Sequence, residues 1–253
     1  SITGKVNKSQ KLYSSKNGKN LITFNGEIFN YKHLKEKNFP LLGKKVTDTE
    51  VLVNMYQKYS YKKVPSILNG MFAYVVFDKT NKRLIVVNDV QGEKNLYYFE
   101  DNNYYIISST IKAIISYIGK PNLNYATLKN YFYSRHFMPL NNTPFKNIKL
   151  YENGINMTFS LKNFEKKKYV YDNPLNWISK KKYQYLDKLS EKELIMYFER
   201  KLIKQAKLMI PNVKFGSIFS GGIDSGLQTA ILSSIKKPNY LLSVNHLKKD
   251  RII

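Results

Sequence analysis

Apolar and polar residues alternate in several short runs through the first two thirds of the chain. These runs are rich in Val, Ile, Phe and Tyr, and clusters of turn-forming residues separate them. They cover residues 21–29, 70–78, 83–89, 95–101 and 104–110. Such spacing predicts an antiparallel meander of β-strands arranged in layered sheets.

Two segments show helical spacing instead. Residues 111–118 are one, and residues 49–58 are the other, where four side chains share a helical face: Val51, Leu52, Met55 and Tyr56. Strands with intervening helices predict an α+β domain over residues 1–165.

The last third of the chain has a different pattern. Over residues 166–189 the apolar pattern dissolves into Lys, Tyr, Asn and Pro, and we expect a linker there. Ser190 and Glu193 then form a capping box that opens a helix. A strand, the glycine-containing loop 220–225, a further helix and a second apolar run follow. This order predicts a βαβ unit, so residues 190–253 are expected to begin an α/β domain with a parallel sheet.

Composition excludes several classes of protein. The 253 residues are 43% hydrophobic and 14% aromatic, which is typical of a folded globular chain. No apolar run reaches the roughly 18 residues that span a bilayer, and the first residues do not follow the pattern of a secretion signal. We therefore expect a cytoplasmic protein without a membrane partner. The sequence contains no cysteine, which excludes disulfides, thiolate metal sites and thiol nucleophiles within these residues.

The formal net charge of +24 would favour a nucleic-acid partner. However, only four of the 42 basic residues are arginine: Arg83, Arg135, Arg200 and Arg251. Arginine makes most bidentate contacts to bases and phosphates, and here lysines are spread along nearly the whole chain. Because Lys, Asn, Ile and Tyr are all abundant, the pattern indicates an A+T-rich genome, and we expect no nucleic-acid partner.

Residues 220–225 read SGGIDS, between a predicted strand and a predicted helix. A Gly-Gly pair there lets backbone N–H groups and the positive end of the helix dipole face an anion such as phosphate. Ser220 and Ser225 add hydroxyl donors. Asp224 would repel phosphate unless a cation intervened, so it is a candidate Mg²⁺ ligand. The alternative is an ordinary tight turn between strand and helix.

Residues 24–30 read FNGEIFN within a strand-like run. The Asn25–Gly26 pair is the strongest short signal for a β-hairpin, because both residues tolerate positive φ. The residues that follow are rich in lysine and compatible with a helix, so a second strand of a hairpin is not evident. The pair is therefore either a turn or part of a functional site.

SGGIDS resembles the pyrophosphate loop of the ATP pyrophosphatase superfamily, whose pattern is SGGxDS. The upstream motifs, in their order, resemble the glutamine-hydrolysing asparagine synthetases, which join a class II glutamine amidotransferase domain to such a loop. The matching stretches are NGEIFN at 25–30, TDTE at 47–50, GMFAY at 70–74, residues 89–98 and IKAI at 111–114. The resemblance implies an amino-terminal-nucleophile-type layered sheet domain, truncated, followed by the start of an ATP-pyrophosphatase domain.

The resemblance also implies roles for individual residues. The Asn25 side chain and the Gly26 N–H would form an oxyanion hole, and Glu27 and Asp48 would hold the α-amino end of glutamine. Ser1 and Ile2, which resemble the end of the family's RLSI motif, would complete the glutamine site. ATP would be bound by these residues: Ile218, Ser220, Gly221, Gly222, Asp224, Ser225 and Val244.

The implied reaction is the ATP-dependent amidation of aspartate to asparagine through an acyl-adenylate, with Mg²⁺ and with ammonia from glutamine. A homodimer is a candidate assembly. The family nucleophile is an amino-terminal cysteine, which these residues do not contain, so we expect a fragment lacking both ends, inactive by itself. Ser1 as a nucleophile is disfavoured because it lies too few residues before Asn25.

Three departures from the family pattern leave the acceptor open: Asn88 replaces Arg, Asn95 replaces Pro and Thr110 replaces Glu. A related amidotransferase acting on a sugar, a peptide or a β-lactam precursor is one alternative. A non-catalytic protein that binds glutamine or ATP is the other.

Overall fold

The computed structural model describes residues 12–43, 45–134 and 141–243. They fall into two compact units, which meet in the chain between Trp177 and Ile178. We call residues 12–177 the first unit and residues 178–243 the second unit.

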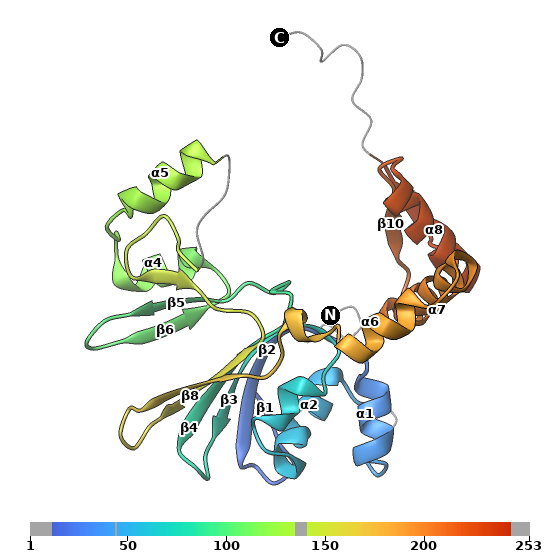
Figure 1. Ribbon diagram of the computed structural model, residues 1–253. Coiled ribbons are helices and arrows are strands. Elements are labelled where there is room, and N and C mark those ends of the chain that lie inside the picture. The colour runs from blue at the N-terminus through green and yellow to red at the C-terminus, as the bar shows by residue number, and fades with distance from the viewer. Residues whose placement is uncertain (1–11, 44, 135–140, 244–253) are drawn as a thin grey trace. The chain divides into compact units, whose positions relative to one another are not determined.

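A six-stranded antiparallel sheet forms the centre of the first unit (Figure 1). Its order is β1-β2-β3-β4-β8-β9. The strands are β1 (Tyr13–Ser14), β2 (Asn20–Ile28), β3 (Gly70–Asp78), β4 (Arg83–Asn88), β8 (Ile155–Ser160) and β9 (Lys166–Val170). The predicted strands at 21–29, 70–78 and 83–89 are confirmed, and they form the expected meander.

A smaller antiparallel sheet packs against one face of the large sheet. It contains β5 (Tyr97–Glu100), β6 (Tyr105–Ser108) and β7 (Ile148–Leu150) in the order β6-β5-β7. Because side chains alternate along a strand, Tyr98 of β5 points to the large sheet, where it packs with Ala73 and Val86. Its neighbour Phe99 points to the opposite face and packs with Ile114.

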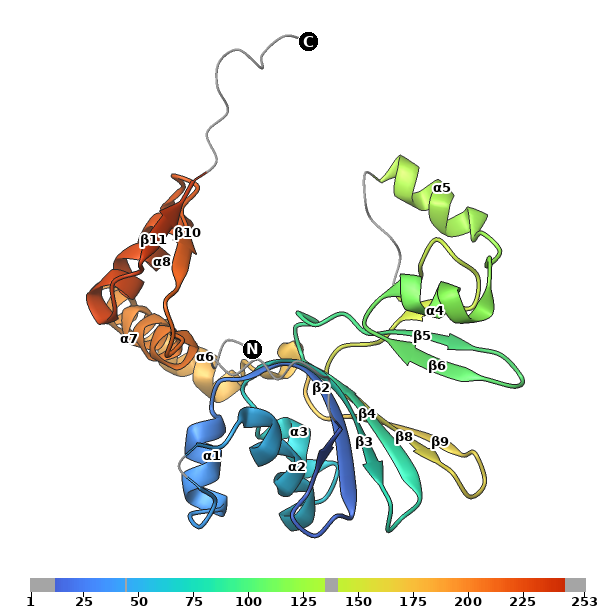
Figure 2. The same cartoon turned by 180° about the vertical axis from the view of Figure 1, so that it is seen from behind.

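Helices cover the outer faces of both sheets (Figure 2). On the large sheet lie α1 (Tyr31–Asn38), α2 (Asp48–Lys58) and α3 (Lys63–Ser66), and on the small sheet lies α4 (Ile111–Ile118), followed in the chain by α5 (Tyr125–Tyr133). The core under α2 contains Val51, Leu52, Met55 and the β3 residues Phe72 and Tyr74. The layers are therefore helix, sheet, sheet, helix, and the predicted α+β layered fold is confirmed.

The sheet extends further along the chain than its sequence indicated. We expected a linker from residue 166, but residues 166–170 form β9, which pairs with β8. All five of these residues are exposed, because β9 is the last strand at its edge of the sheet and both its faces stay open to solvent. An edge strand forms through backbone pairing and needs no apolar alternation.

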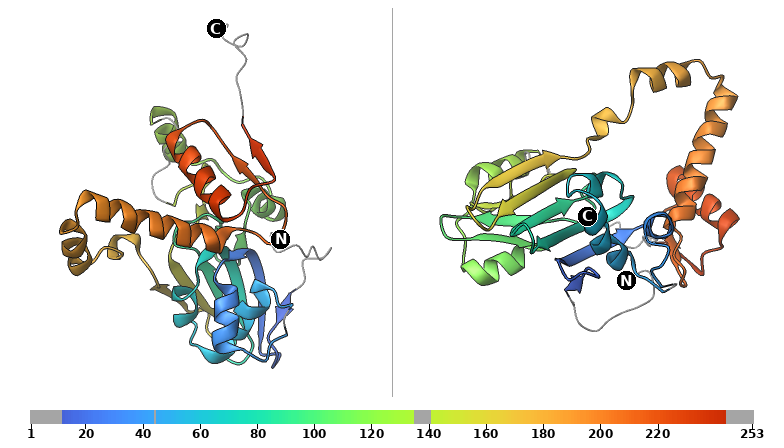
Figure 3. Two further views of the ribbon diagram at one scale, coloured as in Figure 1. Left: turned by 90° about the vertical axis from the view of Figure 1, so that its right-hand side faces the viewer. Right: turned by 90° about the horizontal axis from the view of Figure 1, so that it is seen from below.

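The second unit contains α6 (Lys180–Asp187), α7 (Glu191–Met209), β10 (Gly216–Ile218), α8 (Ile223–Ile235) and β11 (Tyr240–Leu242). Figure 3 shows α7 in orange, with α8 and the two strands in darker orange and red beside it. Strands β10 and β11 are parallel, so the predicted βαβ unit is confirmed. The capping box of Ser190 and Glu193 opens α7 as expected.

Within the described ranges, no helix has the length and the apolar character needed to cross a membrane.

Candidate functional site

Strand β2 runs straight through the Asn25–Gly26 pair, so the hairpin interpretation is wrong. Asn25 lies opposite Ala73 of β3, and Gly26 lies opposite Phe72. Gly26 has φ of +146°, and a Cβ atom there would lie 2.1 Å from the carbonyl oxygen of Met71. Glycine is required because the two strands approach too closely for any side chain.

The backbone N–H of Gly26 faces away from β3. The N–H of Phe72 donates to Oδ2 of Asp89, and the carbonyl of Phe72 accepts from the N–H of Asp89. Both main-chain groups of Phe72 are therefore turned toward Asp89 and away from β2. In an antiparallel pair of this kind the opposite residue also turns its polar groups outward. The Gly26 N–H thus faces the side of β2 on which the described residues place no strand opposite Gly26.

The Asn25 side chain is exposed and lies on the face of the large sheet that carries Ala73. Its Nδ2 donates to Oγ of Ser109, in the connection between β6 and α4, at 3.5 Å. At this length the bond is weak, so the Asn25 amide remains an available donor.

Glu27 and Asp48 bring two carboxylates to the end of β2. Asp48 is the first residue of α2, and its Oδ2 accepts from the N–H of Ile28 at 3.1 Å. Burial raises the pKa of Glu27 to about 7; the charge of Asp48 adds to this shift, and Lys94 opposes it. Burial also raises the pKa of Asp48, against hydrogen bonds from the N–H groups of Ile28 and Thr49.

This pair of carboxylates favours a cationic group. Glu27 is 8% exposed and Asp48 is 5% exposed, so water screens their mutual repulsion poorly. The same two charges act on the neighbouring phenol of Tyr31, whose pKa is raised first by burial and then by Asp48 and Glu27. A ligand ammonium at this position would relieve the repulsion and gain two charge-assisted hydrogen bonds.

Asp89 organises the loop that carries Lys94, a role that sequence reasoning missed. Its carboxylate, which is 2% exposed, accepts hydrogen bonds from four backbone N–H groups. The donors are Phe72, Gln91, Glu93 and Lys94, at 2.9 to 3.2 Å. An Asp followed three residues later by Gly, as in DVQG, is a turn signal that could have indicated this loop.

A second feature that sequence reasoning missed is the capping box at the start of α2. Oγ1 of Thr47 accepts from the N–H of Glu50 at 3.2 Å, and Oε2 of Glu50 accepts from the N–H of Thr47 at 2.7 Å. The signal was present in the sequence as Thr-x-x-Glu. This cap fixes the helix start and therefore the position of Asp48.

The three departures from the family pattern have local structural roles or lie on the surface. Asn88 is buried and donates to the side-chain oxygen of Asn153 at 3.3 Å. Asn95 is exposed. Thr110 is the N-cap of α4 and accepts from the N–H of Ala113 at 3.4 Å.

In the second unit, the SGGIDS loop joins β10 to α8. Gly221 has φ of +84°, a conformation that favours glycine. Oγ of Ser220 and Oγ of Ser225 lie 3.0 Å apart, and Ser225 Oγ also donates to the carbonyl of Gly222 at 3.0 Å. Gly222 is the N-cap of α8 and has no side chain that could cap it. The first N–H groups of α8 therefore remain available to an anion.

The hydroxyl and N–H donors of this loop suit phosphate, and Asp224 is its one carboxylate. Asp224 is exposed in the first turn of α8. In the described part of the chain, no three or more His, Cys, Asp or Glu side chains are grouped so that they could hold a metal ion. Mg²⁺ at Asp224 would thus take its other ligands from phosphate and water, as it commonly does.

The remaining predicted site residues are placed differently or lie outside the description. Ile218, the last residue of β10 and a predicted ATP contact, is 76% exposed. Within the described second unit, β10 pairs with β11 alone, and no further layer covers Ile218. Ser1, Ile2 and Val244 lie outside the described residues.

Comparison with known proteins shows similarity to asparagine synthetases. The chain is 34% identical over 216 residues to a Methanocaldococcus jannaschii protein assigned as asparagine synthetase [glutamine-hydrolyzing] 2, covering 84% of this chain and 40% of the relative. It is 26% identical over 225 residues to the asparagine synthetase [glutamine-hydrolyzing] of Rattus norvegicus, covering 83% of this chain and 36% of the relative. A third relative, asparagine synthetase [glutamine-hydrolyzing] 2 of Bacillus subtilis, is 34% identical over 117 residues, covering 46% of this chain and 15% of the relative.

The chain therefore spans 40% or less of the length of these relatives. Residues 1–170 match the family model described as a glutamine amidotransferase domain. This match covers most of the chain and includes Asn25, Gly26, Glu27 and Asp48. The chain belongs to the glutamine amidotransferase domain family.

Proposed function

We propose that the first unit binds L-glutamine at the end of β2. The α-ammonium group lies between the carboxylates of Glu27 and Asp48, and the side-chain amide extends toward Asn25 and Gly26. The observation that carries the proposal is the buried pair Glu27–Asp48 beside two outward-facing N–H donors on the same strand. Membership of the glutamine amidotransferase family supports glutamine as the ligand.

We further propose that this site releases ammonia from the bound amide. Hydrolysis breaks the C–N bond of the amide, water supplies the new oxygen of glutamate, and the nitrogen leaves as ammonia. Attack on the amide carbon moves charge onto its oxygen, where the Asn25 side-chain N–H and the Gly26 backbone N–H can donate. Donors aimed at a developing oxyanion accelerate such reactions about a hundred- to a thousandfold each. The attacking group is not a thiol of these 253 residues, since the sequence contains no cysteine.

The second unit is proposed to activate the acceptor of the ammonia with Mg·ATP. Ser220, Ser225 and the N–H groups at the start of α8 would hold the phosphates, and Asp224 would hold Mg²⁺, which would neutralise phosphate charge. We propose aspartate as the acceptor, activated as an acyl-adenylate and converted to asparagine in the cytoplasm. The SGGxDS pattern and the similarity to asparagine synthetases support this assignment.

The glutamine site can be tested on the 253-residue chain. L-Glutamine should raise its thermal unfolding temperature, because a ligand that binds only the folded state stabilises it. Asp48→Asn should abolish the effect. Asp101→Asn, a charge-matched change at an exposed turn, should leave it intact. Equal stabilisation by D-glutamine, or an intact response in Asp48→Asn, would contradict the site.

Activity and acceptor can be tested on the native gene product. Aspartate should give pyrophosphate and asparagine in step with glutamate release from glutamine. Pyrophosphate release with a sugar or a peptide and not with aspartate would favour a related amidotransferase. Stabilisation by glutamine without any turnover would favour a non-catalytic binding protein.

A further inference from the structure

A pocket lies at the end of the large sheet that is far from the proposed glutamine site. It is lined where β2 begins, β3 ends and β4 begins, beside the last turn of α2, and its volume is about 260 Å³. Asn20 at this end and Asn25 at the other are five residues apart on β2, which is roughly 17 Å along a strand. The pocket therefore shares no residue with the glutamine site.

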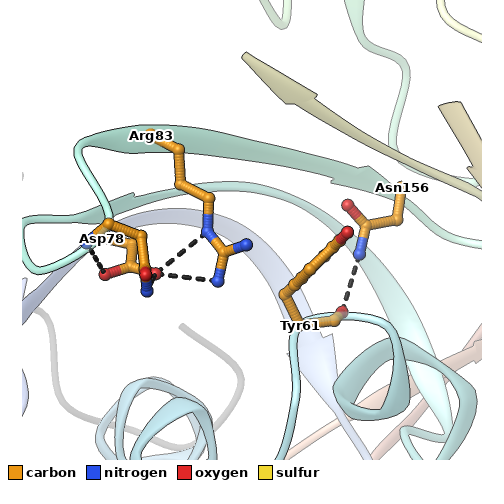
Figure 4. A network of polar contacts seen from close by, with 5 residues as sticks. Tyr61, Asp78, Arg83 and Asn156 are labelled. Atoms are coloured by element: carbon orange, nitrogen blue, oxygen red, sulfur yellow. Dashed lines mark hydrogen bonds and ion pairs between the residues drawn. The ribbon is translucent and has the colours of Figure 1, made fainter. Parts of the chain in front are cut away.

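Arg83 gives this pocket hydrogen-bond donors that are not used within the protein. Its Nε, at 3.0 Å, and one terminal nitrogen, at 2.9 Å, both contact the same oxygen of Asp78 (Figure 4). A guanidinium has five N–H bonds, so three have no partner among the described residues. The ring of Tyr61 lies 4.2 Å from the guanidinium carbon and fixes the orientation of its plane.

Asn20 lines the same pocket and adds a carboxamide to it. The residue is 6% exposed, and its backbone N–H donates to Oγ of Ser15 at 3.0 Å. Its carboxamide has no hydrogen-bond partner within the ranges that the structure describes. This carboxamide is therefore available to a ligand in the pocket.

The charges around the pocket favour an anion. Lys19 lines it, is exposed, and has no ion pair in the described part of the chain. Asp78 neutralises Arg83, and the charge of Lys19 is left in excess. Tyr56 and Tyr59 supply an aromatic wall.

We propose that this pocket binds a small organic anion. Its carboxylate or phosphate group lies among Lys19, Asn20 and Arg83, and its apolar part lies against Tyr56 and Tyr59. The inference does not depend on the proposed glutamine site, since it rests on different residues at the opposite end of β2.

The test uses calorimetric titration of the 253-residue chain with benzoate, benzamide and inorganic phosphate at matched chloride concentration. Benzamide has the shape of benzoate without its charge. Benzoate should bind, benzamide should bind at least tenfold more weakly, and phosphate shows whether the polar group alone suffices. Absence of binding by both benzoate and phosphate, or equal binding of benzamide, would overturn the proposal.

Variants then locate the site. Lys19→Gln changes an exposed residue and should weaken benzoate binding roughly three- to tenfold. Arg83→Lys removes the planar group and should weaken it about tenfold or more. Lys79→Gln removes one charge from the neighbouring β3–β4 turn, outside the pocket lining, and should bind as the unchanged protein does. If Lys79→Gln weakened binding as much as Lys19→Gln, the anion would be responding to general surface charge, and the proposal would be wrong.

Discussion

The carboxylate of Asp48 accepts a hydrogen bond from the backbone N–H of Ile28, at 3.1 Å. One residue begins α2 and the other ends β2, so this bond links the helix start to the strand that carries Asn25, Gly26 and Glu27. The candidate glutamine site is thus held by regular elements on both sides, which is the arrangement that positions side chains most rigidly.

Replacing Glu27 by Gln should stabilise the folded chain at neutral and alkaline pH. Its carboxyl pKa is raised from 4.5 to about 7, so the folded state holds a proton that the unfolded state has lost in this range. Unfolding free energy should therefore fall as pH rises from about 5 to 8 in the unchanged chain, by roughly 1–2 kcal/mol more than in Glu27→Gln. Urea unfolding at several pH values measures the free energy of unfolding of both proteins. If the difference between the two proteins did not change with pH, the burial of the Glu27 charge would be contradicted.

Gly26→Ala should destabilise the first unit by about 3 kcal/mol or more, because the new methyl group meets the Met71 carbonyl and the backbone keeps its positive φ. Gly119→Ala is the matched control. Gly119 also has positive φ, of +80°, but nothing lies within 4 Å of the position that an added methyl group would take. Its cost should be smaller, about 1–2 kcal/mol, because only backbone strain contributes. Denaturant unfolding would reveal any failure of this ranking.

Asp89→Asn should cost about 2–4 kcal/mol, since the amide replaces a carboxylate that accepts four backbone hydrogen bonds in a buried position. Hydrogen exchange should accelerate at the N–H groups of residues 91–94. Asp101→Asn, whose carboxylate accepts two such bonds at an exposed turn, should change stability by less than about 1 kcal/mol. Equal effects of the two changes would show that burial does not strengthen the Asp89 interactions.

Asp224→Asn in the native gene product should abolish ATP-dependent pyrophosphate release and leave glutamate release from glutamine unchanged. The amide keeps the shape of the first turn of α8 but no longer attracts Mg²⁺. Ser225→Ala should weaken ATP use less, because backbone N–H groups at the start of α8 remain. Undiminished pyrophosphate release by Asp224→Asn would contradict the assignment of residues 220–225 as an ATP-binding loop.

The sequence predicted those helices and strands whose local residue pattern matches the way they pack in the fold. Residues 49–58 present an apolar helical face, and α2 buries that face on the sheet. The Asn25–Gly26 pair has two local interpretations, and the close approach of Met71 from β3 decides between them. That contact joins residues far apart in the chain, so spacing alone could not reveal it.

The same limitation applies to charged residues. Residues 166–170 were expected to form a linker because lysines interrupt the apolar pattern, yet β8 supplies their backbone partners. The role of Asp89 was hidden for a related reason, since one of its four donors, Phe72, comes from a different strand.

Strand β9 also bears on how the protein behaves at high concentration. Lys166 pairs with Glu100, and Lys168 pairs with Glu152, so these ammonium groups are anchored along the outermost strand. A second molecule that tried to add its own strand here would have to displace those ion pairs and desolvate the lysines. This edge of the sheet therefore resists fibre-like polymerisation.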